Sequence, residues 1–285
     1  MAERTVTKSP AEEATESLRE LIQEHGDSLP LDVACLAISQ AEQDRSIGRD
    51  TLRRLDSLAE ALDAGFPHQG NPIAKFVAIG EFLFAKENYR GNNEDYYDLR
   101  NSFLDDVVDR RRGIPITLSI LAIEVARRVG FGLRGVGFPG HFLVTTAEPS
   151  NLYLDGFRGG QILGREECGE LLSSLSGGAL EMKASHLEPV NSRQIVARVL
   201  QNIKGIHLRQ GQLEAAVETV NRVLMLFPKA AGLLRERGLI YLQLGAFRFA
   251  AKDLRDYLAQ AQDPPDVEAI EAALARAERK SQMLV

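Results

Sequence analysis

The residues whose types and spacing suggest acid–base or nucleophilic chemistry lie in one stretch of the sequence, from Pro115 to Asp155. His141 and Asp155 are fourteen positions apart, and a carboxylate that orients an imidazole is the usual companion of a histidine base. Thr117 and Ser119 offer hydroxyls shortly after Pro115. The chemistry to consider is therefore attack by one of these side chains, or by water, with His141 taking the proton.

Hydrophobic spacing predicts the elements that must position these residues. Apolar side chains that recur every three or four positions predict a helix from Pro10 and further helices over 31–43, 50–64, 71–86, 101–109, 116–129 and 165–175. Between the last two, β-type patterns punctuated by Pro and Gly predict strands over 133–138, 141–146 and 152–157. The expected fold class is α+β and mostly helical.

The C-terminal part of the chain repeats itself. At an offset of 34 residues the sequence pairs His207 with Tyr241, Leu208 with Leu242, Gly211 with Gly245, Ala216 with Ala250, Val220 with Leu254 and Leu224 with Leu258. This period, with a glycine at the turn and a small alanine at the helix contact, is typical of tetratricopeptide helix pairs. A last helix over 268–280 is expected to cap the second repeat.

Three motifs and the repeats together resemble a known family. RRGIPITLS, GVGFPGHFLV and LDGF, followed by the paired repeats, look like the bacterial SirB-one-type family. The resemblance covers about 30–280 and implies a transglutaminase/papain-like core with a small antiparallel sheet. The expected organisation is a disordered tail (1–9), an N-terminal helical region (10–90), the core (91–187) and tetratricopeptide-like repeats with a capping helix (191–285).

The resemblance also implies a role for each candidate residue. Such cores place a cysteine at the start of a helix that ends about fifteen residues later at a glycine, and here Pro115 precedes Gly130 by fifteen. His141 is expected to start a strand, and Asp155 to orient it from the next strand. Pro115 then takes the place of the cysteine, where it preserves the helix start but supplies no nucleophile.

Each candidate also has a purely structural interpretation. The hydroxyls of Thr117 and Ser119 are expected to satisfy local backbone rather than to act as nucleophiles, because a helix N-terminus alone cannot ionise an alcohol. His141 and Asp155 can form a structural pair, part of a polar pocket, or a remnant catalytic dyad. The loop over 88–100 also has two interpretations, because its amides and phenols can bind a peptide or simply cap the turn and pack. The residues concerned are Asn92, Asn93, Tyr96 and Tyr97.

Composition limits the classes of partner. A net charge of −6 argues against nonspecific binding to nucleic acid or to a membrane surface. The polar start and the lack of an apolar run near 18 residues predict no leader and no membrane span, so a cytoplasmic location is expected. Two cysteines and five scattered histidines predict no disulfide framework, no metal site and no cofactor.

The function that these features favour is binding rather than catalysis. We expect a non-enzymatic protein-binding or regulatory module whose protein or peptide partner is recognised by the core groove or by the repeats. Candidate polar residues of the repeat face are Asn202, Lys204, Arg209 and Arg235. The alternative is a hydrolase or acyltransferase of the transglutaminase or cysteine-protease type that uses an unconventional nucleophile with His141 and Asp155.

Overall fold

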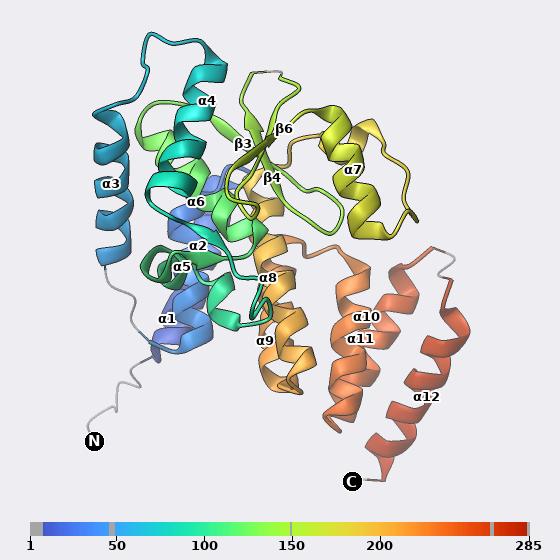
Figure 1. Ribbon diagram of the computed structural model, residues 1–285. Coiled ribbons are helices and arrows are strands. Elements are labelled where there is room, and N and C mark those ends of the chain that lie inside the picture. Colours follow the sequence, from blue (N-terminus) through green and yellow to red (C-terminus); the bar gives the residue numbers. More distant parts are fainter. Residues whose placement is uncertain (1–7, 46–48, 149, 263–264, 284–285) are drawn as a thin grey trace, which may run out of the picture. The chain divides into compact units, whose positions relative to one another are not determined.

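The computed structural model describes residues 8–45, 49–148, 150–262 and 265–283, and Figure 1 shows its elements. The chain divides into two compact units, one up to Val199 and one from Leu200. The boundary falls inside helix α8 (Ser192–Arg209). Positions 1–7 of the expected tail lie outside the described residues, and Ser9 already caps the first helix.

The first unit begins with helices whose starts follow capping rules. α1 (Pro10–His25) opens with the predicted capping motif: the Glu12 N–H donates to Ser9 Oγ at 3.2 Å, and the Ser9 N–H donates to Glu12 Oε2 at 2.9 Å. α2 (Leu31–Gln43) and α3 (Asp50–Asp63) follow and match the predicted helices closely.

The segment predicted as one helix over 71–86 is in fact two elements. α4 (Pro72–Gly80) is capped by the side chain of Asn71, and a π-helix, η1 (Glu81–Lys86), continues it. Phe82, Leu83 and Phe84 are consecutive and all buried. A wider turn rotates less per residue, so it brings successive side chains closer to one face than an α-helix does.

The helix predicted over 101–109 was placed too early. A 3₁₀ turn, η2 (Leu99–Ser102), comes first, and α5 (Leu104–Arg110) begins after an extended Phe103. The reason is local hydrogen bonding, because Asp98 caps the 3₁₀ turn through the Arg100 N–H at 3.0 Å.

Helix α6 (Pro115–Arg128) is the central element of the first unit. It contacts α2, α3, α4, α5 and two strands of the sheet, as Figure 1 shows. Every residue from Pro115 to Ala126 is buried. Such a helix has no solvent face for most of its length, so its N-terminal end is fixed by packing on all sides.

The main sheet is antiparallel and has the order β3–β4–β5–β6 among the described residues. Its strands are β3 (Leu133–Val136), β4 (Leu143–Thr146), β5 (Tyr153–Asp155) and β6 (Gln161–Leu163). The predicted strands were too long at their ends, and β6 was missed because it is three residues long and follows two glycines. A parallel pair, β1 (Arg90–Gly91) with β2 (Arg112–Gly113), ties the 88–100 loop to the start of α6.

Beyond the sheet come α7 (Arg165–Ser176) and a 3₁₀ turn, η3 (Ala184–Leu187). Cys168, Leu171 and Leu172 of α7 join Val136, Phe138 and Leu143 in one apolar cluster. The helix thereby covers one face of the sheet, as an antiparallel sheet with one buried face requires.

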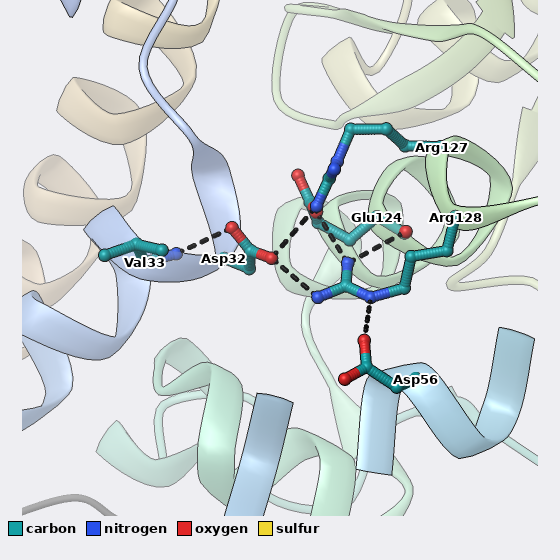
Figure 2. A network of polar contacts seen from close by, with 6 residues as sticks. All are labelled: Asp32, Val33, Asp56, Glu124, Arg127 and Arg128. Carbon is teal, nitrogen blue, oxygen red and sulfur yellow. Dashed lines mark hydrogen bonds and ion pairs between the residues drawn. The ribbon is translucent and has the colours of Figure 1, made fainter. Parts of the chain in front are cut away.

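An ionic network fastens α2 and α3 to the end of α6 (Figure 2). Asp32 Oδ2 accepts from Arg127 Nη2 at 3.1 Å and from Arg128 Nη2 at 2.7 Å. Glu124 Oε2 accepts from both arginines, and Arg128 Nε reaches Asp56 Oδ1 at 2.8 Å. The carboxylates of Asp32 and Glu124 are almost wholly buried, so their charges depend on these two guanidinium groups.

The second unit consists of helix pairs that follow the 34-residue period. α9 (Leu213–Leu226) and α11 (Phe247–Gln260) correspond residue for residue at that offset, and α8 and α10 (Ala231–Gln243) end at corresponding positions. Gly211 and Gly245 have φ of 70° and 73°, which suits glycine at the turn of each pair. α12 (Val267–Gln282) packs on α11, as expected of the capping helix.

Candidate functional site

The N-terminus of α6 is closed by backbone contacts. Pro115 occupies the first turn after an extended Ile114. Thr117 Oγ1 accepts from the Ile114 N–H at 3.1 Å and lies 2.8 Å from the carbonyl oxygen of Asn101, to which it donates. A Cβ on Gly113 would lie 2.8 Å from the same hydroxyl, so this position requires glycine. The hydroxyl of Thr117 is thus engaged on both sides by the main chain.

Ser119 lies one turn deeper in α6. Its side chain is 1% exposed, and its Oγ has no hydrogen-bond partner among the residues that the structure describes. The hydroxyl of Ser102 is in the same situation. Within the described ranges, no hydrogen bond joins either hydroxyl to His141.

His141 and Asp155 are in direct contact. His141 Nε2 lies 2.8 Å from Asp155 Oδ2, and both side chains are buried. Asp155 Oδ1 accepts from the N–H groups of Phe157 at 3.1 Å and Arg158 at 3.2 Å. Arg158 Nε is 3.9 Å from Oδ2. The carboxylate is thus fixed by the turn that follows its own strand, which leaves Oδ2 to orient the imidazole.

His141 does not start a strand, as had been expected. It lies in the turn after Pro139 and Gly140, two residues before β4, and its N–H donates to the carbonyl of Phe138 at 3.0 Å. Gly140 has φ of 68° at this turn. Because of this tight turn, β4 begins only at Leu143. Asp155 lies as predicted on the next strand, at the end of β5.

Arg198 from α8 holds this turn in place. Its Nη2 lies 3.1 Å from the carbonyl oxygens of both Phe138 and His141. Burial lowers the pKa of the guanidinium, against a smaller opposing effect of Tyr96. Sequence reasoning missed Arg198 because no local pattern links a helix residue to a turn 57 positions away. Phe157 and Arg158 were missed as well, although an aspartate that ends a strand before a Gly-rich turn is a signal for such backbone capping.

The amides of the 88–100 loop shape the loop itself. Asn92 is 4% exposed; its Nδ2 donates to Asn101 Oδ1 at 3.1 Å, and its Oδ1 accepts from the Asp95 N–H at 3.2 Å. Asn101 Nδ2 donates to the carbonyl of Asp95 at 2.7 Å. Asn93 is exposed.

The tyrosines of the same loop lie over the histidine site. Tyr96 and Tyr97 are 38% and 49% exposed. Tyr96 packs edge-to-face on Phe157, which packs in the same way on His141. Gly91 makes this possible, since a Cβ there would lie 2.6 Å from the ring and carbonyl of Phe157.

The cysteines do not form part of this site. Cys35 lies in α2, and burial raises the pKa of its thiol, with smaller contributions from Glu124 and Asp32. Burial likewise raises the pKa of Cys168 in α7 to about 11, with Glu167 and Asp155 adding to the effect. Both thiols are therefore protonated near neutral pH, which suits structural rather than reactive cysteines. Among the described residues no cluster of three or more His, Cys, Asp or Glu side chains has the arrangement of a metal site.

The four candidates on the repeats differ in their surroundings. Lys204 is buried and reaches Glu236 Oε2 at 2.5 Å, and Arg235 pairs with Asp266. Asn202 is half-buried and Arg209 is exposed. Lys204 and Arg235 therefore form ion pairs within the second unit.

Comparison with known proteins identifies the class of protein. A family model described as the transglutaminase-like superfamily matches residues 49–201, and a tetratricopeptide repeat model matches residues 203–275. The first match covers more than half of the chain, and the chain belongs to the transglutaminase-like superfamily. The predicted fold, a transglutaminase-like core followed by tetratricopeptide repeats, is confirmed.

Relatives place the chain more narrowly. A UPF0162 protein of Xylella fastidiosa is 42% identical over 188 residues, which cover 65% of this chain and 67% of that protein. A UPF0162 protein of Vibrio cholerae is 26% identical over 92% of this chain and 98% of its own length. Mouse F-box only protein 21 is 28% identical over 59% of this chain but only 28% of its own. This chain is thus a member of the UPF0162 family, as the SirB-one-type resemblance implied.

Menin is a solved structure with a much weaker likeness. It has a TM-score of 0.40 and 9% identity over 85% of this chain and 69% of its own. A likeness at this level supports no conclusion on function. In the described part of the chain, no helix combines the length and apolar character that a membrane span needs.

Proposed function

We propose that this protein is a non-enzymatic protein-binding or regulatory module built on a transglutaminase-like core that lacks the nucleophilic cysteine. The observation that carries the proposal is Pro115 at the first position of α6. A proline at this point has no side-chain nucleophile, and it completes the helix start at no cost in hydrogen bonds. Thr117, the nearest hydroxyl, already bonds to two backbone groups.

The tetratricopeptide repeats support binding as the function. Such repeats suggest protein–protein interaction, since their stacked helices offer an extended surface to a partner. Of the repeat candidates, Arg209 is exposed and Asn202 half-buried, so both are proposed for direct contact, while Lys204 and Arg235 form ion pairs with Glu236 and Asp266. On the core, the exposed Tyr96, Tyr97 and Asn93 are the candidates. We infer a cytoplasmic location, in keeping with two free, buried cysteines.

The second candidate function is catalysis with an unconventional nucleophile. The observation that favours it is the contact between His141 and Asp155 at 2.8 Å, which has the geometry of a base and its orienting carboxylate. In this alternative the protein is a hydrolase or acyltransferase in which His141 activates water or a hydroxyl. Ser119 has an unbonded hydroxyl, but it is 1% exposed.

The test compares the full chain with two full-length variants. Wild type, His141→Ala and Arg209→Glu are immobilised, partners are captured from a native lysate, and each variant's melting temperature is measured. Intact mass spectrometry checks for a covalent adduct. We expect a partner whose capture falls at least tenfold with Arg209→Glu, and no adduct.

The other outcomes are equally informative. Turnover or an adduct that disappears with His141→Ala at an unchanged melting temperature would move the function into the catalytic class. If the wild-type chain captures no partner and no adduct forms, the binding proposal loses its support.

A further inference from the structure

A line of aromatic rings leads from solvent to the buried histidine. The ring centroids of Tyr97 and Tyr96 are 5.3 Å apart, those of Tyr96 and Phe157 5.8 Å, and those of Phe157 and His141 6.0 Å, all edge-to-face. Exposure falls from 49% at Tyr97 to 6% at His141. Exposed aromatic rings of this kind supply large contact area at little entropic cost, which makes them frequent anchors at interfaces.

Arg198 lies beside this line of rings and has no carboxylate partner among the described residues. One nitrogen of Arg198, Nη2, donates to the carbonyl oxygens of Phe138 and His141. Within the ranges that the structure describes, its Nε and Nη1 have no hydrogen-bond partner, and no acidic side chain forms an ion pair with it. Arginines that are mostly removed from water are normally paired. Burial lowers the pKa of this guanidinium, and its electrostatic effect on the pKa of Tyr96 indicates that it lies close to the aromatic line.

The acidic residues nearby are already committed. Asp155 is fully buried and bonds to His141 and to two backbone N–H groups. Glu94 pairs with Arg112, and Asp98 pairs with Arg100 and Arg110.

Two other charged residues adjoin members of the aromatic line in the sequence. Asp95 is exposed next to Tyr96. Arg158, whose side chain is 43% exposed, approaches Asp155 instead, with its Nε 3.9 Å from Oδ2. Among the described residues neither Asp95 nor any other carboxylate forms an ion pair with Arg198, whose printed partners are two carbonyl oxygens.

We propose that Tyr96, Tyr97, Phe157 and Arg198 form a docking surface for an acidic internal segment of a partner protein, with an Asp or Glu carboxylate on Arg198 and an apolar side chain on the two tyrosines. A planar guanidinium with free donors matches a carboxylate better than any other common side chain. The aromatic line extends over several rings, which suits an extended segment rather than a single small anion. This inference rests on the proposed binding function and adds the chemistry of the partner.

The experiment is a selection of random twelve-residue peptides on the full chain. The peptides are displayed with both ends fused, so that no free terminal carboxylate takes part. Enriched peptides are then synthesised with blocked ends, and their Kd is measured by fluorescence anisotropy at about 50 and 300 mM salt. Variants are Tyr97→Ala, Arg198→Gln and the control Arg53→Gln, whose arginine is 74% exposed on α3.

We expect enriched peptides to carry Asp or Glu next to an aromatic or aliphatic residue and to bind more weakly at high salt. Their Kd should rise at least tenfold with Arg198→Gln and several-fold with Tyr97→Ala, and stay within twofold with Arg53→Gln. Because Arg198 also holds the His141 turn, the melting temperature of Arg198→Gln is measured, and Tyr97→Ala gives an independent answer on an exposed side chain.

Three results would overturn the inference. They are the failure of any peptide to be enriched, the enrichment of neutral or basic peptides, and acidic peptides whose Kd does not change with Tyr97→Ala. Peptides that are lost with Arg209→Glu but bind both core variants normally would keep the protein-binding function and assign it to the repeats.

Discussion

Thr117 lies two positions after Pro115, in the first turn of α6, and its hydroxyl joins two backbone groups that would otherwise be unpaired. It accepts from the Ile114 N–H and donates to the Asn101 carbonyl. A buried backbone group without a partner costs more than a made hydrogen bond contributes. At the residue scale, the side chains around Pro115 therefore maintain the start of a central helix.

The first prediction concerns this hydroxyl. Thr117→Val keeps the shape but leaves Ile114 N–H and the Asn101 carbonyl unpaired, and we expect it to lower the free energy of unfolding by about 1–3 kcal/mol. Thr117→Ser keeps the hydroxyl and loses one methyl group, at about 1 kcal/mol. Urea unfolding at constant m-value measures both, and a valine variant as stable as wild type would contradict the role of the hydroxyl.

At the scale of elements, the network in Figure 2 joins three helices through charges that are largely out of water. Its two buried carboxyls, those of Asp32 and Glu124, respond to pH in opposite directions. Burial and the neighbouring charge of Asp32 raise the pKa of Glu124 above 4.5, despite the arginine contacts. Burial also acts to raise the pKa of Asp32, but hydrogen bonds from Arg128 and the Val33 N–H, with the charge of Arg128, lower it below 3.8.

The direction in which each carboxyl changes stability with pH depends on whether the folded or the unfolded state binds its proton more tightly. The folded state binds the Glu124 proton more tightly, so that contribution to stability is present below pH 4.5 and is lost as pH rises through the raised pKa. The Asp32 contribution is present above pH 3.8 and is lost as pH falls through the lowered pKa.

The second prediction uses this difference. Glu124→Gln removes the titration, so the stability of the variant relative to wild type should improve as pH rises from 4.5 towards 7. Asp32→Asn is the matched control, and its relative stability should improve only as pH falls below 3.8. Thermal unfolding across this pH range measures both, and parallel curves for wild type and Glu124→Gln would show that Glu124 does not titrate as described.

At the scale of the whole molecule, two compact units each have a core of their own. In the second unit α10 and α11 approach closely at Gly238, where a Cβ would lie 2.8 Å from Leu254 Cδ2 and 3.2 Å from Asp253 Cβ. Gly232 in the same helix has open space around it. One helix therefore offers two glycines with opposite expectations.

The third prediction is that Gly238→Ala destabilises the second unit by roughly 1–2 kcal/mol, since overpacking outweighs the gain in helix propensity. Gly232→Ala should stabilise it by about 0.5–1 kcal/mol. Hydrogen exchange should change in peptides from α10 and α11. Equal changes in peptides from α6 would contradict the assignment of this effect to the second unit.

The sequence predicted most of the helices because a buried stripe at helical spacing is a local signal, and α2 and α3 agree with it almost to the residue. The repeat was equally predictable, because its 34-residue period is kept in the positions of both helix pairs. Neither the π-turn of η1 nor the short strand β6 has a local pattern that separates it from its neighbours.

The site was predictable in part. The contact of His141 with Asp155 was expected from the family motif, and its role in the function stays a prediction. Arg198 was beyond reach, because its partners are carbonyl oxygens that no sequence pattern marks. A contact between a side chain and a remote turn depends on the packing of the whole unit, so a local sequence pattern does not predict it.

The positions of the two cysteines have a practical consequence. Cys35 and Cys168 are 3% and 0% exposed, lie in separate parts of the first unit, and have raised pKa values. A thiol-specific reagent at neutral pH can therefore reach them only when the surrounding structure opens. The second unit contains no cysteine. The rate at which each thiol of the native chain is modified thus reports the opening of its own part of the first unit, without any introduced label.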